Sequence, residues 1–278
     1  MMPTRVVRLR SFSLRAAIAL AFVARVAAPP TLHAQFGVDK TELFLNTSDS
    51  VGRTGIVMVR NEGNSRAQAT LKLEDWDRAE DGANRFFAPG TVAQSCAQAL
   101  KIFPLSISLA PGESQAIRVE MDSAYARTLK ARECWSVVLV ETAVPQTEAG
   151  GRVLLYRLRT GVKVYATPQG LSADGVVTDV AIRAGSAGMS GELKDTVAVA
   201  FQNTGSKHVI ARGRVEVRRA DNSTVAVVEL PAAYALPGAT MKVRAALPAL
   251  AAGRYVVLAV MDYGGSEIAA AQLEYEAR

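Results

Sequence analysis

The sequence has few of the residues on which enzymes depend. It contains two histidines and two cysteines among 278 residues. It has no Gly-rich phosphate loop, no HExxH motif and no G-x-S-x-G motif. His208 follows a turn and is predicted to lie at the surface. The acids between Asp75 and Asp81 lack the spacing of a calcium loop, which favours a solvated loop over a cation site. The sequence therefore predicts no enzyme, no cofactor and no metal site.

Long apolar runs are also scarce, and the only marked one lies near the start. Residues 1–15 carry four arginines and no acid, and residues 16–28 are apolar apart from Arg25. A basic start, a short apolar run and a small residue at Ala34 form the layout of a secretory signal. No later run approaches the length of a membrane span. We predict that residues 1–34 are a cleaved signal peptide and that the exported remainder is soluble.

The excess of basic residues belongs to this leader. The chain has 32 Lys and Arg against 26 Asp and Glu, and five of the arginines but none of the acids precede residue 35. The remainder holds 27 basic and 26 acidic residues, which is nearly neutral. The basic surface that nucleic acid requires is therefore not expected.

Cys96 and Cys134 are the only cysteines. In an exported chain an even pair favours a disulfide over a metal or catalytic site. We predict that the two residues are bonded.

Most of the sequence after residue 37 alternates apolar and polar residues, as β-strands with one buried face do. Turn-forming groups such as Asn61-Glu62-Gly63 and Pro111-Gly112 separate these runs. In the first half the predicted strands are 38–45, 55–60, 67–76, 102–109, 115–121, 133–141 and 153–165, with irregular stretches over 77–99 and 142–152 and a short helical turn within 123–132. This spacing, with hardly any helical periodicity, predicts an all-β fold of immunoglobulin-like sandwich type.

The second half repeats this style. Its predicted strands are 196–202, 211–219, 224–230, 241–247, 254–262 and 268–276. Asn203-Thr204-Gly205 echoes Asn61-Glu62-Gly63, and Pro237-Gly238 echoes Pro111-Gly112. We therefore predict two tandem immunoglobulin-like β-sandwich domains, residues 35–168 and 169–278, after the signal peptide at 1–34.

The run from Val153 to Tyr165 is a long predicted strand with two different faces. Its apolar side chains are Leu154, Tyr156, Leu158, Val162 and Val164, and its basic ones are Arg157, Arg159 and Lys163. The sequence Thr167-Pro168 ends it, because proline lacks an N–H donor. Such a strand is either the last core strand of a sandwich or an edge that accepts another chain.

A set of short motifs in a fixed order makes residues 38–168 resemble the N-terminal domain of the periplasmic pilus-assembly chaperones. These motifs are Asp39-Lys40-Thr41, Val59-Arg60-Asn61, the stretch from Leu109 to Gln115 with Ile117-Arg118-Val119, Arg132-Glu133, and Val162-Lys163-Val164-Tyr165 closed by Pro168. The second half resembles immunoglobulin-like domains only in general terms.

The resemblance implies binding of secreted, pilin-like subunits by donor-strand complementation in the periplasm, and an outer-membrane usher as a second partner. It implies that Leu154, Tyr156 and Leu158 are the side chains lent to the client. It also implies that Lys163, assisted by Arg157, anchors the client's terminal carboxylate in a cleft between the domains.

The sequence departs from the family at one position of the anchor. Glu42 stands where the family has an arginine, and its charge opposes a client carboxylate unless Lys40 or Arg157 compensates. The alternative function is that of a structural or adhesive immunoglobulin-like protein at the cell surface, without a client. In that case Leu154, Tyr156 and Leu158 would be ordinary core residues and Lys163 a solvated lysine.

Overall fold

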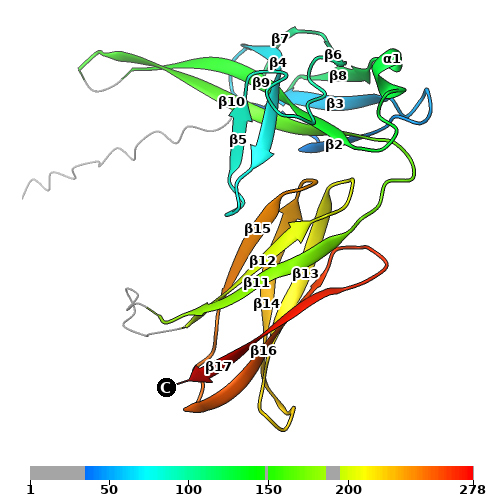
Figure 1. Cartoon of the computed structure of the whole chain (residues 1–278). Helices are drawn as coiled ribbons and strands as arrows, with labels where there is room; N and C mark the ends of the chain where they lie inside the picture. Colours follow the sequence, from blue (N-terminus) through cyan, green and yellow to red (C-terminus); the bar gives the residue numbers. More distant parts are fainter. Residues whose placement is uncertain (1–34, 148–149, 186–194, 278) are drawn as a thin grey trace, which may run out of the picture. The chain divides into compact units, whose positions relative to one another are not determined.

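The computed structural model of the chain describes residues 35–147, 150–185 and 195–277 (Figure 1). Within these residues the predicted all-β fold, with two β-sandwiches in tandem, is confirmed. The predicted signal peptide lies outside the described residues. No helix in the described part of the chain has the length and apolar character needed to cross a membrane.

Ten strands and one short helix form the first sandwich. They are β1 (Phe36–Val38), β2 (Glu42–Asn46), β3 (Thr54–Asn61), β4 (Ala67–Arg78), β5 (Asn84–Phe87), β6 (Leu100–Phe103), β7 (Ser106–Leu109), β8 (Ser114–Met121), α1 (Ser123–Ala126), β9 (Cys134–Thr147) and β10 (Val153–Thr167). One sheet has the order β1-β3-β8-β6, and the other β2-β10-β9-β4-β5 with β7 also paired to β4. The inward residues of both sheets, such as Val59, Val119, Val138 and Val164, form one core.

Seven strands form the second sandwich. They are β11 (Gly175–Arg183), β12 (Thr196–Asn203), β13 (Val209–Arg218), β14 (Thr224–Ala235), β15 (Thr240–Ala246), β16 (Gly253–Asp262) and β17 (Ala269–Ala277). The sheets β11-β12-β15 and β14-β13-β16-β17 enclose a core of their own. β14 lies against β15 and β11 against β17, so the two sheets meet at both sides. The exact division at residues 168 and 169 stays a prediction.

The echo between the halves has a structural basis in two buried asparagines. The amide group of Asn61 donates to the carbonyls of Ser65 and Leu109, and its side-chain oxygen accepts the N–H of Gly63. Asn203 makes the same three bonds, to Lys207, Ala235 and Gly205. The backbone carbonyl of each asparagine also accepts from the glycine of a Pro-Gly turn, Gly112 or Gly238. Each asparagine therefore fastens one loop and one turn to its core.

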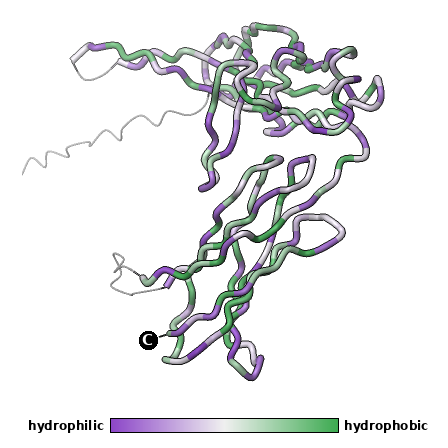
Figure 2. The backbone as a smooth tube through the Cα atoms, viewed as in Figure 1, coloured by the Kyte–Doolittle hydropathy of each residue, from purple (hydrophilic) through white to green (hydrophobic). Residues whose placement is uncertain are grey.

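Several predicted boundaries were wrong. The polar stretch 77–99 is not wholly irregular, because β4 continues to Arg78 and pairs with β5 in a hairpin. Figure 2 shows this hairpin as hydrophilic toward its tip, which explains why apolar alternation did not reveal it. The predicted strand 38–45 is divided into β1 and β2, and the predicted strand 102–109 into β6 and β7. β11 was not predicted at all.

The region between the predicted strands 133–141 and 153–165 also differs from the expectation. Residues 142–147 continue β9 rather than forming a loop. They pair with β10 over Val153–Leu158, so the two strands form a long hairpin that extends past the rest of the first sandwich (Figure 1).

Candidate functional site

The outer part of this long hairpin is a two-stranded ribbon, which we call the arm. It consists of Thr142–Thr147 of β9 and Val153–Arg159 of β10. β2 pairs with β10 only from Lys163 onward, and β4 pairs with β9 only as far as Glu141. Among the strands that the structure describes, none pairs with the outer side of the arm's β10 segment. We call this side the open edge.

The direction of the backbone groups along the open edge follows from one hydrogen bond. The N–H of Lys163 donates to the carbonyl of Thr41, on the side of β2. In an antiparallel hairpin the residues alternate between facing the partner strand and facing away from it. The N–H and C=O groups of Val153, Leu155, Arg157 and Arg159 therefore point outward. They are available to an added strand.

The other margin of the arm is less suited to pairing. By the same alternation, Ala143, Pro145 and Thr147 of β9 face outward, and Pro145 has no N–H to donate. The hydroxyl of Thr142 donates to the carbonyl of Gln68 where β4 and β9 separate. A proline on an edge discourages strand addition. The arm thus has one margin that favours an additional strand and one that disfavours it.

The predicted client-binding side chains share one face of the arm. Leu154, Tyr156 and Leu158 are half-buried and lie on the same side of β10 as the core residues Val162 and Val164. They extend the apolar face of the sandwich beyond its closed core. The opposite face of the sheet, which we call the outer face, is also apolar at the tip of the arm, where Val153 is 60% and Leu155 71% exposed.

Arg157 lies on the outer face and is part of a charged group around Glu141. The Glu141 carboxylate contacts Lys72 at 2.9 Å, Arg159 at 2.9 Å and Arg157 at 3.6 Å. A hydrogen bond from Lys72 and the charges around it lower the pKa of Glu141 against the opposing effect of burial. Arg157 is six residues from Lys163, or about 20 Å along the strand. The two predicted anchor residues are therefore not brought together.

Lys163 instead lies beside an arginine that the sequence analysis did not single out. Its ammonium is 4.6 Å from the centre of the Trp76 ring. The guanidinium of Arg78, on the same strand as Trp76, is 5.8 Å from that ring and 5.2 Å from the ring of Tyr234. Burial, followed by the positive charge of Arg78, lowers the pKa of Lys163, and Glu42 opposes this shift. Lys163 and Arg78 thus both lie close to the same indole.

Glu42 is a further charged residue beside Lys163 and Arg78. It is opposite Lys163 in the parallel pairing of β2 with β10. It does not form an ion pair with Lys163 within 4 Å, among the contacts of the described residues. Burial and then the charge of Glu42 raise the pKa of Tyr165, and a hydrogen bond to Glu42 adds to the effect. Lys40, the other possible substitute, is engaged elsewhere, with Asp39 at 3.2 Å and the carbonyl of Ile56.

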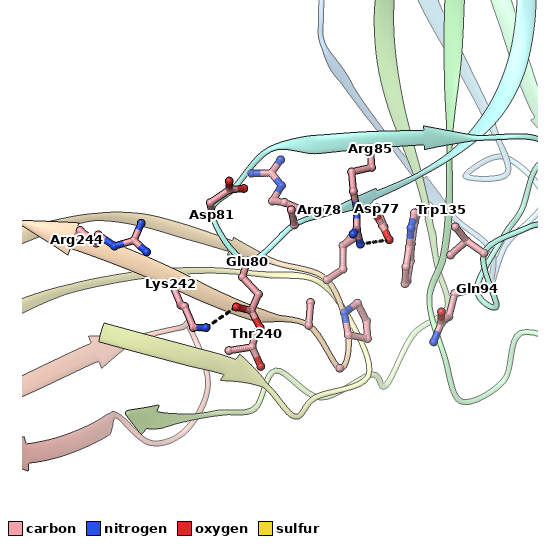
Figure 3. Close-up of a pocket in the computed structure, with 16 residues that line it drawn as sticks. Asp77, Arg78, Glu80, Asp81, Arg85, Gln94, Trp135, Thr240, Lys242 and Arg244 are labelled. Carbon is pink, nitrogen blue, oxygen red and sulfur yellow. Dashed lines mark hydrogen bonds and ion pairs between the residues drawn. The ribbon is translucent and has the colours of Figure 1, made fainter. Parts of the chain in front are cut away.

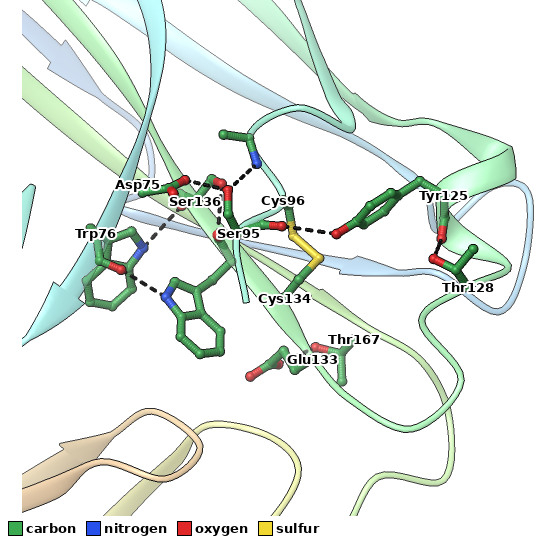
Figure 4. The surroundings of a disulfide bond; sticks show 12 residues. Asp75, Trp76, Ser95, Cys96, Tyr125, Thr128, Glu133, Cys134, Ser136 and Thr167 are labelled. Atoms are coloured by element: carbon green, nitrogen blue, oxygen red, sulfur yellow. Dashed lines mark hydrogen bonds between the residues drawn. A yellow bond between two sulfur atoms is a disulfide. The ribbon is translucent and has the colours of Figure 1, made fainter. Parts of the chain in front are cut away.

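His208 is not the surface residue that the sequence suggested. Its backbone N–H donates to Glu133, and its ring Nδ1 lies 2.9 Å from both carboxylate oxygens. Its ring stacks on that of Tyr165, with 4.2 Å between the centres. The Glu133 side chain is fully buried and also accepts the hydroxyl of Thr167, which lies near it in Figure 4. A lone histidine gave no sequence signal for this role, because its partner is 75 residues away.

The predicted disulfide is confirmed, and it lies at the root of β9. Cys96 and Cys134 are bonded, and no described cysteine is free. Figure 4 shows Asp75 and Ser95 beside the bridge. The buried Asp75 accepts from the Ser95 hydroxyl and from the N–H of Val92. Asp75 therefore fastens the loop that carries Cys96, and its assignment to a solvated loop was wrong.

The indole of Trp76 is held rigidly where Lys163 and Arg78 meet it. Its N–H donates to the carbonyl of Ser136, and the indole N–H of Trp135 donates back to the carbonyl of Trp76. Both tryptophans are buried in a small apolar cluster with Val137, Tyr165 and Leu236.

The β4–β5 hairpin contributes further charged groups at a polar pocket next to Arg78 (Figure 3). Asp77 and Arg85 form a two-point ion pair within the hairpin at 2.7 Å. At its tip, Glu80 binds Lys242 through its side chain, and its carbonyl accepts the N–H of Lys242. These acids are paired one by one and do not converge on a common point.

Comparison with known proteins finds similar solved structures at low sequence identity. No protein-family model and no curated protein sequence matches the chain. Solved structures that are similar to it include fimbrial periplasmic chaperones. The class 5 fimbriae chaperone CfaA is 10% identical over 87% of this chain and 100% of its own, with a TM-score of 0.46.

Two further examples have similar values. The E. coli chaperone DraB is 13% identical over 87% of this chain and 98% of its own, with a TM-score of 0.43. A chain from the complex of SafA pilin with the SafB chaperone of Salmonella enterica is 13% identical over 89% of this chain and 99% of its own, with a TM-score of 0.41.

Proposed function

We propose that this protein is a periplasmic chaperone that binds exported, pilin-like subunits by lending them β10. The observation that carries the proposal is the open edge, which combines outward backbone groups with a row of apolar side chains. A subunit that lacks one strand gains main-chain hydrogen bonds from Val153–Arg159 and burial from Leu154, Tyr156 and Leu158. The sequence resemblance of residues 38–168 to pilus-assembly chaperones supports the same function.

The energy for this binding comes from surface burial. A half-buried leucine or tyrosine that becomes fully buried contributes about 1 kcal/mol or more at ~25 cal/mol per Å². Burial of the three side chains and backbone pairing along the strand both favour the complex, and neither requires ATP. Because Pro145 disfavours pairing at the other margin, the subunit strand is expected to bind at the β10 margin alone.

We further propose that Lys163 and Arg78 together hold the client's terminal carboxylate. Two cations on one rigid indole, without a carboxylate within ion-pair distance of Lys163 among the described residues, form a site that an anion stabilises. Arg78 takes this role in place of Arg157, whose guanidinium is committed to Glu141. This assignment supplies the second cation of the anchor. In the family that cation is an arginine of the first strand, at the position where this chain has Glu42.

An outer-membrane usher is the second partner that the family resemblance implies. A suitable surface is the outer face of the sheet β1-β3-β8-β6. Ile56 and Phe103 both lie opposite Arg118 in the strand pairing, and Met58 lies one row away. These three side chains are exposed, which is unusual for neighbouring apolar residues of this size.

The proposal is tested by co-purification from periplasm. Tagged protein should retain subunits that mass spectrometry identifies, and Tyr156→Asp should lose them because a carboxylate enters the apolar interface. Leu155→Asp is the matched control, since Leu155 is the next residue on the opposite, exposed face. Equal retention by all three proteins, or no retained subunit with the unaltered protein, would leave a structural immunoglobulin-like tandem as the better description.

A further inference from the structure

Glu42 lies beside both cations of the proposed anchor. It pairs in register with Lys163, and both side chains project from the outer face of the sheet. Together with Trp76, Arg78, Tyr165 and His208 it lines one cavity. Lys163 does not line this cavity, so Arg78 is the cation of the proposed anchor that Glu42 meets there, while Arg78 and Glu42 both act on the pKa of Lys163 after burial.

The space beside Glu42 is small. The cavity has a volume of about 10 Å³, which is room for one water molecule at most. A carboxylate is larger than a water molecule. It therefore does not fit against Arg78 and His208 while the side chain of Glu42 stays in place.

We propose that Glu42 is a resident carboxylate that closes the anchor in the empty protein, so that a terminal carboxylate binds only by displacing it. Glu42 and Tyr165 line this cavity together, beside Arg78. Glu42 then acts as a selectivity device, because it weakens the binding of weak or isolated anions. A client that also pairs along the open edge has enough binding energy to displace it.

The proposal rests on the anchoring role proposed above for Lys163 and Arg78, and a small anion probes it without any client. Acetate is titrated into the unaltered protein and into Glu42→Gln, and the NMR signals of the Lys163 side chain are followed. We expect acetate to bind Glu42→Gln about five- to tenfold more tightly, since one nearby negative charge is removed. Acetamide should give the same small response in both proteins. Glu229→Gln, at an exposed position of β14, is the charge-matched control.

A second arm separates this inference from the proposed function. Two synthetic peptides with the same alternating valine and threonine sequence, one ending in a carboxylate and one in an amide, are tested for binding. Failure of both peptides to bind, with acetate still favouring Glu42→Gln, would refute strand lending and leave the resident carboxylate intact. Equal acetate affinity in the two proteins would overturn the present inference, whatever the peptides do.

Discussion

The imidazole of His208 and the carboxylate of Glu133 form a bonded pair at the base of β10. Glu133 accepts from the backbone N–H of His208 and lies within 2.9 Å of its ring Nδ1. The ring itself lies flat on Tyr165, two residues from Lys163. The pair therefore fixes the end of the strand that carries the proposed anchor.

Glu133→Gln should destabilise the protein by about 1–3 kcal/mol. The amide has one accepting oxygen where the carboxylate has two, so buried donors lose a partner. Urea unfolding followed by tryptophan fluorescence measures the loss. Glu120→Gln, at a half-exposed carboxylate of β8 that pairs with Arg118, should change stability by less than about 1 kcal/mol. A loss of that small size for Glu133→Gln would show that the pair is dispensable.

Removal of the disulfide should cost up to about 4 kcal/mol. Cys96 and Cys134 are 38 residues apart, and a closed loop of that length restricts the unfolded chain by about this amount. Thermal unfolding with and without reductant gives the difference, and the double variant Cys96→Ala/Cys134→Ala should match the reduced protein. An unchanged melting temperature would mean that Asp75 and Ser95 hold the loop without the bridge.

Asn61→Ala and Asn203→Ala should have similar effects, each about 2–4 kcal/mol. Both substitutions leave two buried carbonyls and one N–H without their partner. Hydrogen exchange should locate the first loss in the first sandwich and the second loss in the second. A large difference between the two values would contradict the equivalence of the two turns.

The affinity of the anchor for a carboxylate should fall as the pH rises and Lys163 loses its charge. This loss should occur at a lower pH than it would for an exposed lysine. Burial and Arg78 lower the pKa of Lys163, so its charged form is lost earlier as the pH increases. Arg78→Gln should raise this pKa, and Glu42→Gln should lower it further. NMR titration of the Lys163 side chain provides the measurement, and shifts of the opposite sign in the two variants would refute the arrangement of charges.

Arg157→Pro should abolish subunit binding at the open edge, whereas Arg157→Ala should preserve most of it. The N–H of Arg157 points outward, so proline removes a donor needed by the added strand and none that pairs β10 with β9. Circular dichroism checks that the hairpin persists. Normal binding by Arg157→Pro, with the hairpin intact, would exclude main-chain pairing at this position.

Local pattern was enough to predict some of these features. Alternation placed Leu154, Tyr156 and Leu158 on one face of a strand, export context predicted the Cys96–Cys134 bond, and repeated turn motifs predicted two similar sandwiches. The alternation and the turns depend on residues that are close in sequence, and the disulfide depends on the chemistry of the two cysteines alone. None of these predictions requires knowledge of which strand pairs with which.

The composition of the anchor was not predictable in this way. Arg157 shares a face with Lys163, and their spacing of six residues in the predicted strand already separated the two by about 20 Å; the positions of the other residues could not be derived in this way. Arg78, in a hydrophilic hairpin, reaches the Trp76 ring that Lys163 also contacts, and His208, after an ordinary turn, reaches Tyr165. Both approaches depend on pairings that span many residues. The local sequence of Arg78 and of His208 is that of surface residues. Long-range pairing, rather than propensity, determined their positions.

The unequal margins of the arm also have a consequence for handling the pure protein. A strand with free backbone groups can join a copy of itself, whereas the β9 margin with Pro145 cannot easily continue the sheet. Association through β10 should therefore stop at pairs and not grow into fibres. The concentration at which pairs form then sets how much vacant protein is ready for its next subunit.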